Sequence, residues 1–305
     1  MRIYIKTPLV NKSKMIPHLT EHCTWHSVLN LEDYFDFSYW MDGVINTDYA
    51  YFEFDKWIKY NDAIKKLTKK ITKESFSYEK KIIKQELEDI SYDQRIFEYV
   101  VKKYLDSDFF MNKYQTASRK DVKDYHEKYY VQENMIVVDN EFNILKQWFK
   151  TKNWSKNYNN KIVKRKLNFE GDKYLIYLWK KTDWTWYWKM YFFFWMLCFF
   201  WAYSQRWQKW EYYYLEPYFY EYENSCIVLI WDYDYSQLDK EFFEWWKKYI
   251  INMFEAWYFK EKFFLNEYFY WIPKTRKEVI QMCKNFTREE FKELLGFIWL
   301  DIKFN

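Results

Sequence analysis

Two histidines stand four residues apart near the start of the chain, in the run His18-Leu-Thr-Glu21-His22. Residues at this spacing share one face of a helix, so both imidazoles can be directed to one cation. Glu21 precedes the second histidine, and from there its carboxylate can reach a water held by the metal without being a ligand. The run H-x-x-E-H therefore predicts a metal site in which Glu21 is the general base.

A third ligand is offered by a segment with the periodicity of a long helix, expected over residues 76–105. Glu86 falls within its apolar stripe, four residues after Ile82 and four before Ile90. A carboxylate on that stripe is unfavourable unless an opposite charge compensates it, and either a zinc ion or a lysine would do so. We expect Glu86 to join the two histidines around a zinc ion.

Two neighbouring residues allow alternative interpretations. Glu79 precedes Glu86 by two helical turns and either orients a metal ligand by a hydrogen bond or is a solvated acid at the start of the helix, which the sequence slightly favours. His26 follows His22 by one turn and can substitute as a ligand. A histidine on the pocket wall or on the surface is its more ordinary interpretation.

Taken together, these residues resemble the pitrilysin and insulinase family of zinc metallopeptidases, which includes the mitochondrial processing peptidases and carries H-x-x-E-H followed by a distant glutamate. The family pattern around that glutamate, E-[KR]-x-V-[VI]-x-x-E-[IL], is similar to Glu79-Lys-Lys-Ile-Ile-Lys-Gln-Glu86-Leu87. Residues 116–138 also resemble the family passage T-x-x-D-L-x-x-F-H-x-x-Y-Y-x-P-x-N-M-x-L-V-V. The resemblance implies a zinc-dependent endopeptidase that hydrolyses unfolded peptides or oligopeptides.

The resemblance continues in Arg206-Trp-Gln-Lys-Trp210-Glu-Tyr-Tyr213, which is similar to the family's R-E-x-x-G-L-x-Y. It implies that Arg206 and Tyr213 are catalytic residues that contact the substrate carbonyl. His22 and Glu86 lie closer together in the sequence than is usual in the family, which leaves the substrate preference open.

A strand pattern of the family is abbreviated here over residues 43–54. The resemblance implies that an extended peptide adds as a further strand beside residues 44–53, where backbone hydrogen bonds would provide affinity. The substrate-binding residues expected on this segment are Asn46, Tyr49 and Tyr51.

Strands separated by helices in both halves of the chain predict an α+β protein with two similar domains, each a mostly antiparallel sheet with helices packed on it. The domains expected are a zinc-binding domain at 1–148, a linker at 149–168 and a domain at 169–305 that carries the Arg/Tyr pair. Strands are expected at 2–9, 43–54, 135–138, 173–179, 213–220 and 225–231, and helices at 17–26, 31–40, 56–70, 76–105, 119–129, 189–202, 236–255, 276–284 and 287–296.

Charge and cysteine usage narrow the classes of partner. The 48 Lys+Arg and 44 Asp+Glu residues are interspersed, with a net charge of +4, which argues against nucleic acid. The four scattered cysteines form no C-x-x-C pair, which argues against disulfides and favours a reducing compartment, so a cytoplasmic location is expected. The longest apolar run, 190–202, is too short to span a bilayer, and the N-terminus lacks the pattern of a signal peptide, so no membrane partner is expected.

Glycine and tryptophan usage is abnormal, with 3 and 19 residues. Ordinary usage predicts roughly 20 glycines in a chain of this length. One hypothesis is that UGA codons meaning glycine were translated as tryptophan, and Trp210 indeed stands where the family pattern has glycine. Trp184, Trp210 or Trp231 would then lie at turns, exposed or at positive φ. A genuinely tryptophan-rich protein is the alternative, and it must turn with little glycine.

In the family, a zinc-bearing half closes against a second half that supplies the arginine and the tyrosine. This chain has half that size and carries both sets of residues, so the resemblance implies a homodimer with shared sites, or a heterodimer with a related subunit. The alternative function is a non-catalytic, peptide-binding partner subunit, against which the complete H-x-x-E-H argues. A structural protein with coincidental histidines is a third possibility that metal analysis distinguishes.

Overall fold

The structure is a computed structural model that divides into two compact units, Met1–Thr151 and Lys152–Asn305. The residues described are 1–8, 15–28, 41–45, 49–55, 57–86, 92–105, 117–149, 163–180, 184–209, 218–222, 225–231, 240–256, 259–269 and 275–299. The expected helix at 31–40 lies outside them.

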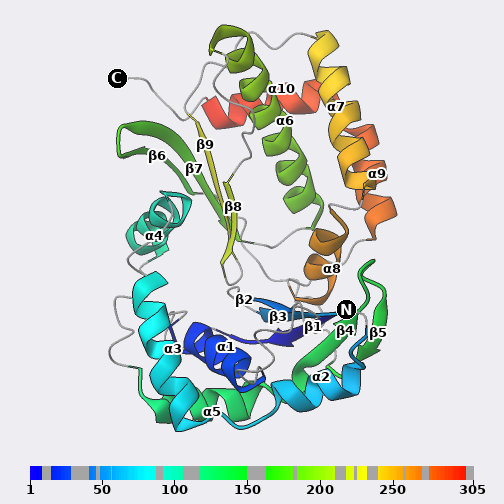
Figure 1. Cartoon of the computed structure of the whole chain (residues 1–305). Helices are drawn as coiled ribbons and strands as arrows, with labels where there is room; N and C mark the ends of the chain where they lie inside the picture. The colour runs from blue at the N-terminus through cyan, green and yellow to red at the C-terminus, as the bar shows by residue number, and fades with distance from the viewer. Residues whose placement is uncertain are drawn as a thin grey trace. The chain divides into compact units, whose positions relative to one another are not determined.

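The first unit is built on a five-stranded antiparallel sheet with the strand order β2-β3-β1-β4-β5 (Figure 1). Its inner strands β1 and β3 pair from Arg2↔Glu53 to Lys6↔Tyr49, so strands remote in sequence form the centre of the sheet. The strands are β1 (Arg2–Lys6), β2 (Met41–Ile45), β3 (Tyr49–Phe54), β4 (Met135–Val138) and β5 (Ile144–Gln147).

The single strand expected over 43–54 is therefore wrong, because the chain forms two antiparallel strands there, paired from Met41↔Phe54 to Ile45↔Ala50. The expected strand at 2–9 ends at Lys6. Strand β5 has no counterpart among the expected elements, since its alternation is too short and polar to stand out.

Helices cover one face of this sheet, with α1, α2 and α5 lying against it (Figure 1). Alternate side chains of the inner strands, including Ile3, Phe52 and Val137, pack with Leu67 and Tyr125 from the helices in one buried cluster. The helical elements are α1 (Met15–Val28), α2 (Tyr60–Leu67), α3 (Lys73–Glu86), α4 (Tyr92–Leu105), α5 (Arg119–Tyr129) and the 3-10 turn η2 (Gln132–Asn134).

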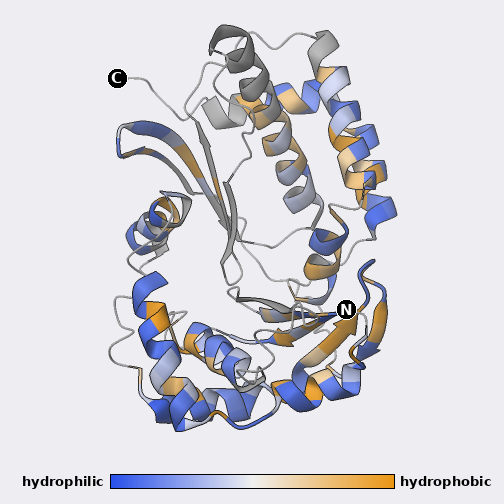
Figure 2. Cartoon of the chain, viewed as in Figure 1, coloured by the Kyte–Doolittle hydropathy of each residue, from blue (hydrophilic) through white to orange (hydrophobic). Residues whose placement is uncertain are grey.

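The long helix expected over 76–105 is instead two helices, since α3 ends at Glu86 and α4 begins at Tyr92. The apolar periodicity of the sequence does not separate these two helices, and residues 87–91 lie outside the described part of the chain. Hydropathy differs strongly between elements that touch the core: β4 is hydrophobic along its whole length and α5 is mainly hydrophilic (Figure 2). Helix α5 contributes a narrow inward stripe of Val122, Tyr125 and His126.

The second unit contains a four-stranded antiparallel sheet with the order β6-β7-β9-β8. Residues 163–168 of the expected linker belong to its first strand, because they pair with β7 from Val163↔Leu178 onward. The elements are β6 (Val163–Phe169), β7 (Asp172–Lys180), α6 (Trp184–Lys209), β8 (Tyr218–Tyr222), β9 (Ser225–Trp231), α7 (Lys240–Glu255), α8 (Lys260–Tyr268), α9 (Arg276–Asn285) and α10 (Arg288–Trp299). Helix α8 has no expected counterpart.

Aromatic rings make up much of the core of the second unit. Trp188 of α6 is fully buried and stacks on Phe263 with ring centroids 4.7 Å apart. Within the described residues, no helix is long and apolar enough to cross a membrane, α6 included. The mixture of helices with antiparallel sheets agrees with the expected α+β class.

The tryptophans occupy mixed environments. Trp184 opens α6 and Trp231 ends β9, so the expectation of turns at these positions is wrong, and Trp210 lies outside the described residues. The described non-glycine residues at positive φ include no tryptophan. Trp57, in contrast, lies in a turn with 78% of its surface exposed. The buried indole N–H of Trp188 has no hydrogen-bond partner in the described part of the chain, which is unusual for a buried tryptophan.

Candidate metal centre

Helix α1 presents the H-x-x-E-H run. The helix begins at Met15, so Pro17 lies in its first turn, where a missing N–H disturbs no intrahelical bond. Two buried threonines, Thr20 and Thr24, satisfy their hydroxyls by donating to the carbonyls of Ile16 and Thr20, at 2.6 and 2.7 Å. Polar side chains can therefore be buried in this helix without a partner from elsewhere.

Helix α3 packs against α1 and brings Glu86 to the two histidines. The Nε2 atoms of His18 and His22 are 3.2 Å apart, and Oε2 of Glu86 lies 3.7 Å from the first and 3.5 Å from the second. A point equidistant from the three atoms lies about 2.0 Å from each, which is the bond length of zinc to imidazole nitrogen or carboxylate oxygen. The residues therefore fit one small cation.

The position of Glu86 differs from the expectation in one respect. It is the last residue of α3, and 44% of its side chain is exposed, so it is not a carboxylate enclosed in an apolar stripe. Ile83, one turn earlier, is fully buried and takes the inward position of the helix. Because the Glu86 carboxylate is partly solvated, it does not need a metal to compensate its charge. The convergence with the histidines, rather than burial, indicates a ligand.

Glu21 lies beside His22 and is buried in the first unit. Only 4% of its surface is exposed, and its Oε2 lies 3.8 Å from Nε2 of His22. Burial raises the pKa of this carboxyl to about 8, and the charges of Glu86 and Glu79 add to that shift. The charge of His22 and a hydrogen bond from the Trp25 side chain oppose it. This hydrogen bond was not expected from the sequence, although Trp25 follows Glu21 by one helical turn.

Glu79 is buried, with 8% of its surface exposed, so its interpretation as a solvated acid is wrong. Its Oε2 lies 3.0 Å from Nδ1 of His22, on the side of the ring away from the other ligand atoms. Its Oε1 lies 2.9 Å from Nδ1 of His26. The structure thus places His26 on Glu79, and the triad that can hold a metal is His18, His22 and Glu86.

The carboxylates surrounding His22 set its protonation in the metal-free protein. Burial by itself lowers the pKa of the imidazole, but hydrogen bonds to Glu79 and Glu86 raise it to about 10. The charge of Glu21 acts in the same direction. The hydrogen bond from His22 in turn lowers the pKa of Glu86. Binding of a cation therefore displaces a proton from His22.

The expected substrate-binding residues do not lie on a free sheet edge. Tyr49 and Tyr51 belong to β3, whose backbone pairs with β1 on one side and β2 on the other, so no peptide can add there. Their rings pack against Tyr4, with centroids 5.7 and 5.3 Å from it. Asn46 lies outside the described residues. The correction arises because sheet order depends on pairing with residues 2–6, which the local pattern does not contain.

The two expected catalytic residues of the second unit are not placed. The backbone of Arg206 belongs to α6, but its side chain is outside the described part of the structure, and Tyr213 is outside it altogether.

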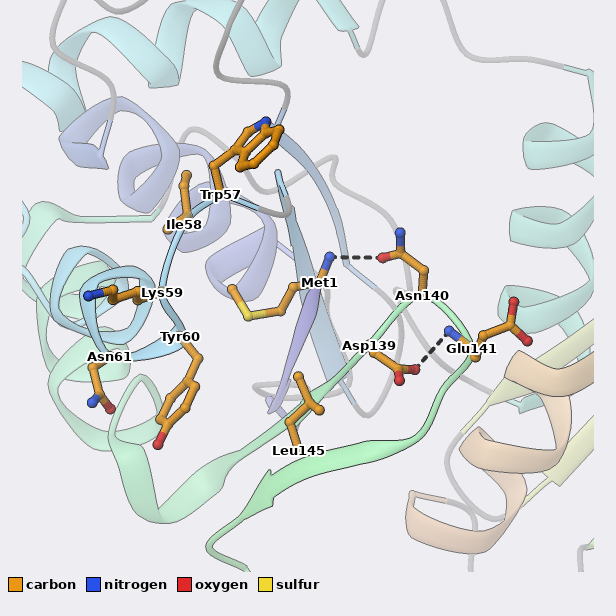
Figure 3. A pocket seen from close by; sticks show the side chains of 10 residues that line it. All are labelled: Met1, Trp57, Ile58, Lys59, Tyr60, Asn61, Asp139, Asn140, Glu141 and Leu145. Atoms are coloured by element: carbon orange, nitrogen blue, oxygen red, sulfur yellow. Dashed lines mark hydrogen bonds between the residues drawn. The ribbon is translucent and has the colours of Figure 1, made fainter.

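A pocket of about 620 Å³ lies elsewhere on the first unit, lined by residues from the start of α2 and from the turn between β4 and β5 (Figure 3). The amino group of Met1 donates there to Oδ1 of Asn140 at 2.9 Å, and the carboxylate of Asp139 accepts from the backbone of Glu141. None of the three candidate metal ligands lines it.

Comparisons with protein-family models, with curated proteins and with solved structures found no match for this chain. The interpretation of the metal centre therefore depends on its own geometry.

Proposed function

We propose that the chain is a zinc-dependent endopeptidase of the pitrilysin and insulinase type that acts on unfolded peptides. The observation that supports this most strongly is the convergence of three ligand atoms, two imidazole and one carboxylate, around a point about 2.0 Å from each. Three protein ligands leave one position of a tetrahedral zinc site open, which is the arrangement of catalytic rather than structural zinc.

Zinc held by His18, His22 and Glu86 would polarise a scissile carbonyl and acidify the attacking water. Glu21 is suited to be the general base, because its Oε2 lies 3.8 Å from Nε2 of His22 and it is not one of the three residues that can hold the metal. In the proposed reaction it accepts a proton from the water and later delivers that proton to the amine leaving group. Because Glu21 is buried, bulk water is kept away from the proton that Glu21 holds between these two steps.

Glu79 supports the site by accepting a hydrogen bond from Nδ1 of His22, at 3.0 Å. The contact orients the ring so that Nε2 faces the other two ligand atoms. A histidine bonded in this way keeps one tautomer, with the proton on Nδ1 and the lone pair on Nε2.

We propose that an extended peptide substrate adds as a further strand beside the edge strand β2. This site replaces the expected one along the whole segment 44–53. Among the described strands β2 pairs with β3 only, and it contacts α1, the helix that bears the histidines. A peptide bound there by backbone hydrogen bonds would run close to the metal centre, and only an unfolded chain presents its backbone in this way.

The proposal keeps two points that rest on the sequence resemblance. Arg206 and Tyr213 contact the substrate carbonyl, and the protein is a cytoplasmic homodimer or forms a heterodimer with a related subunit. A non-catalytic partner subunit is less well supported, because such a subunit has no use for a buried base beside the metal ligands.

The test is metal content together with hydrolysis of an unfolded peptide. The purified wild type should hold about one zinc per chain, and Glu21→Gln should keep that zinc while hydrolysis falls by at least about a hundredfold. Glu127→Gln, which removes an exposed carboxylate with 47% of its side chain accessible, is the matched control and should remain active. Loss of zinc in Glu21→Gln would show that Glu21 is a ligand, and wild type without zinc would refute the proposal.

A further inference from the structure

Four residues after His22, a third imidazole, that of His26, reaches the carboxylate of Glu79 that also contacts His22. His26 and His22 lie one turn apart on α1, and each directs its Nδ1 to Glu79 of α3, at 2.9 and 3.0 Å. The two imidazoles use different oxygens, Oε1 for His26 and Oε2 for His22. The carboxylate thus bridges two rings of one helix face.

The bridge is almost enclosed on the side of Glu79 and opens toward solvent at His26. The exposed fractions of the side chains are 10% for Glu79, 17% for His22 and 25% for His26. The ring of Tyr78 lies beside His26, with centroids 5.0 Å apart, and is itself half exposed. His26 therefore stands between the buried carboxylate and the surface.

A buried carboxylate requires partners for both oxygens, because an unsatisfied oxygen is strongly unfavourable. If only His22 donated to it, Glu79 would gain by turning its second oxygen toward water and so leaving His22. Donation from His26 removes that tendency. The charge of Glu79 opposes ionisation of Glu21, so a second donor to Glu79 also limits repulsion when Glu21 is ionised.

We propose that His26 is a positioning residue of the metal centre. By donating from Nδ1 to Oε1 of Glu79, it holds the other oxygen of that carboxylate on Nδ1 of His22, and thereby keeps Nε2 of His22 directed at the cation. The inference rests on the proposed metal site but assigns His26 no contact with the metal or the substrate.

The test compares zinc affinity, by competition with a chelator, and the Nδ1 proton signal of His22 in the zinc-loaded full chain, by ¹H–¹⁵N NMR. His26→Phe keeps a ring and removes the donor. We expect zinc affinity to fall by about tenfold, the lower end of the range for lost partners of ligating histidines, and the His22 proton signal to broaden or disappear. His26→Asn should restore both, since its amide nitrogen is as many bonds from Cβ as Nδ1 is.

Tyr78→Leu is the matched control, because it removes the ring beside His26 and leaves the hydrogen bond. It should bind zinc as the wild type does, and an equal loss in Tyr78→Leu and His26→Phe would mean that packing is responsible, which overturns the proposal. Unchanged affinity and an unchanged His22 signal in His26→Phe overturn it as well. Complete loss of zinc in His26→Phe, with zinc retained in Glu86→Gln, would make His26 a ligand instead.

Failure of the two ideas is distinguishable. Wild type that binds no zinc refutes the proposed function before any variant is compared. Wild type that binds zinc with an affinity insensitive to position 26 leaves the metal centre standing and refutes only the role of His26.

Discussion

Glu21→Gln in the metal-free protein measures how strongly the fold opposes a charge at the position of the base. The substitution keeps the size of the side chain and removes the ionisation. Glu21 is 4% exposed, and burial is the main cause that raises its pKa from 4.5 to about 8. The folded protein therefore holds the proton of Glu21 over a range of pH in which the unfolded chain has released it.

The sign and size of the effect follow from this difference. The stability that the folded protein gains from keeping Glu21 protonated is fully present below about pH 4.5 and is lost as the pH rises through about 8. One unit of pKa corresponds to about 1.4 kcal/mol. Between pH 5 and pH 8.5, the wild type should lose up to about 4 kcal/mol of unfolding free energy relative to Glu21→Gln. Because the charge of Glu21 helps to raise the pKa of His22, the comparison reports the ionisation of Glu21 together with its interaction with His22.

Urea unfolding of both proteins after chelator treatment, at the two pH values, gives the difference directly. Glu127→Gln, which removes an exposed carboxylate, should follow the wild type at both values. Added zinc should abolish most of the advantage of Glu21→Gln at pH 8.5, since a nearby cation favours the ionised carboxylate. If the difference in unfolding free energy between the two proteins is the same at pH 5 and pH 8.5, the pKa of Glu21 is not raised by folding and the reasoning is refuted.

Three further outcomes are expected. Zinc affinity, measured by chelator competition, should rise about tenfold per pH unit between pH 7 and pH 9, because His22, with a pKa raised to about 10, must release a proton to bind; a flat profile would mean that His22 is not a ligand. Mixing Glu21→Gln with Tyr213→Phe under subunit exchange should restore roughly a quarter of wild-type hydrolysis if two chains share each site, and exchange without recovery would place both residues within one chain. Mass spectrometry of the native peptide that contains position 210 should find glycine, and tryptophan there would end the recoding hypothesis.

The sequence predicts those features of the candidate site that depend on residue spacing within a single helix. The four-residue spacing of His18 and His22 fixes their common face, and the seven-residue spacing of Glu79 and Glu86 does the same on α3. What spacing cannot give is the packing of α1 on α3, which sets the 3.5 Å between His22 and Glu86. The resemblance supplied that pairing, and the structure agrees with it.

The same limit explains the errors. The resemblance placed Tyr49 at a binding edge, but whether a strand is inner or outer is decided by partners elsewhere, here Lys6. The role of Glu79 was underestimated because its burial depends on the contact with α1. The sequence does not separate α3 from α4, since apolar residues continue at helical spacing beyond Glu86.

The two histidines and Glu86 come from helices that are far apart along the chain, with the β2–β3 hairpin and α2 between them. In terms of chain entropy, a cation bound to all three is a crosslink that closes a loop of roughly 60 residues, a constraint worth about 4 kcal/mol on the relation used for covalent crosslinks. The zinc would then restrict the segment that contains β2, β3 and α2, because both ends of this segment would be bound to the same ion. Chelation should accordingly expose backbone in β2 and β3 to proteases before it affects the second unit.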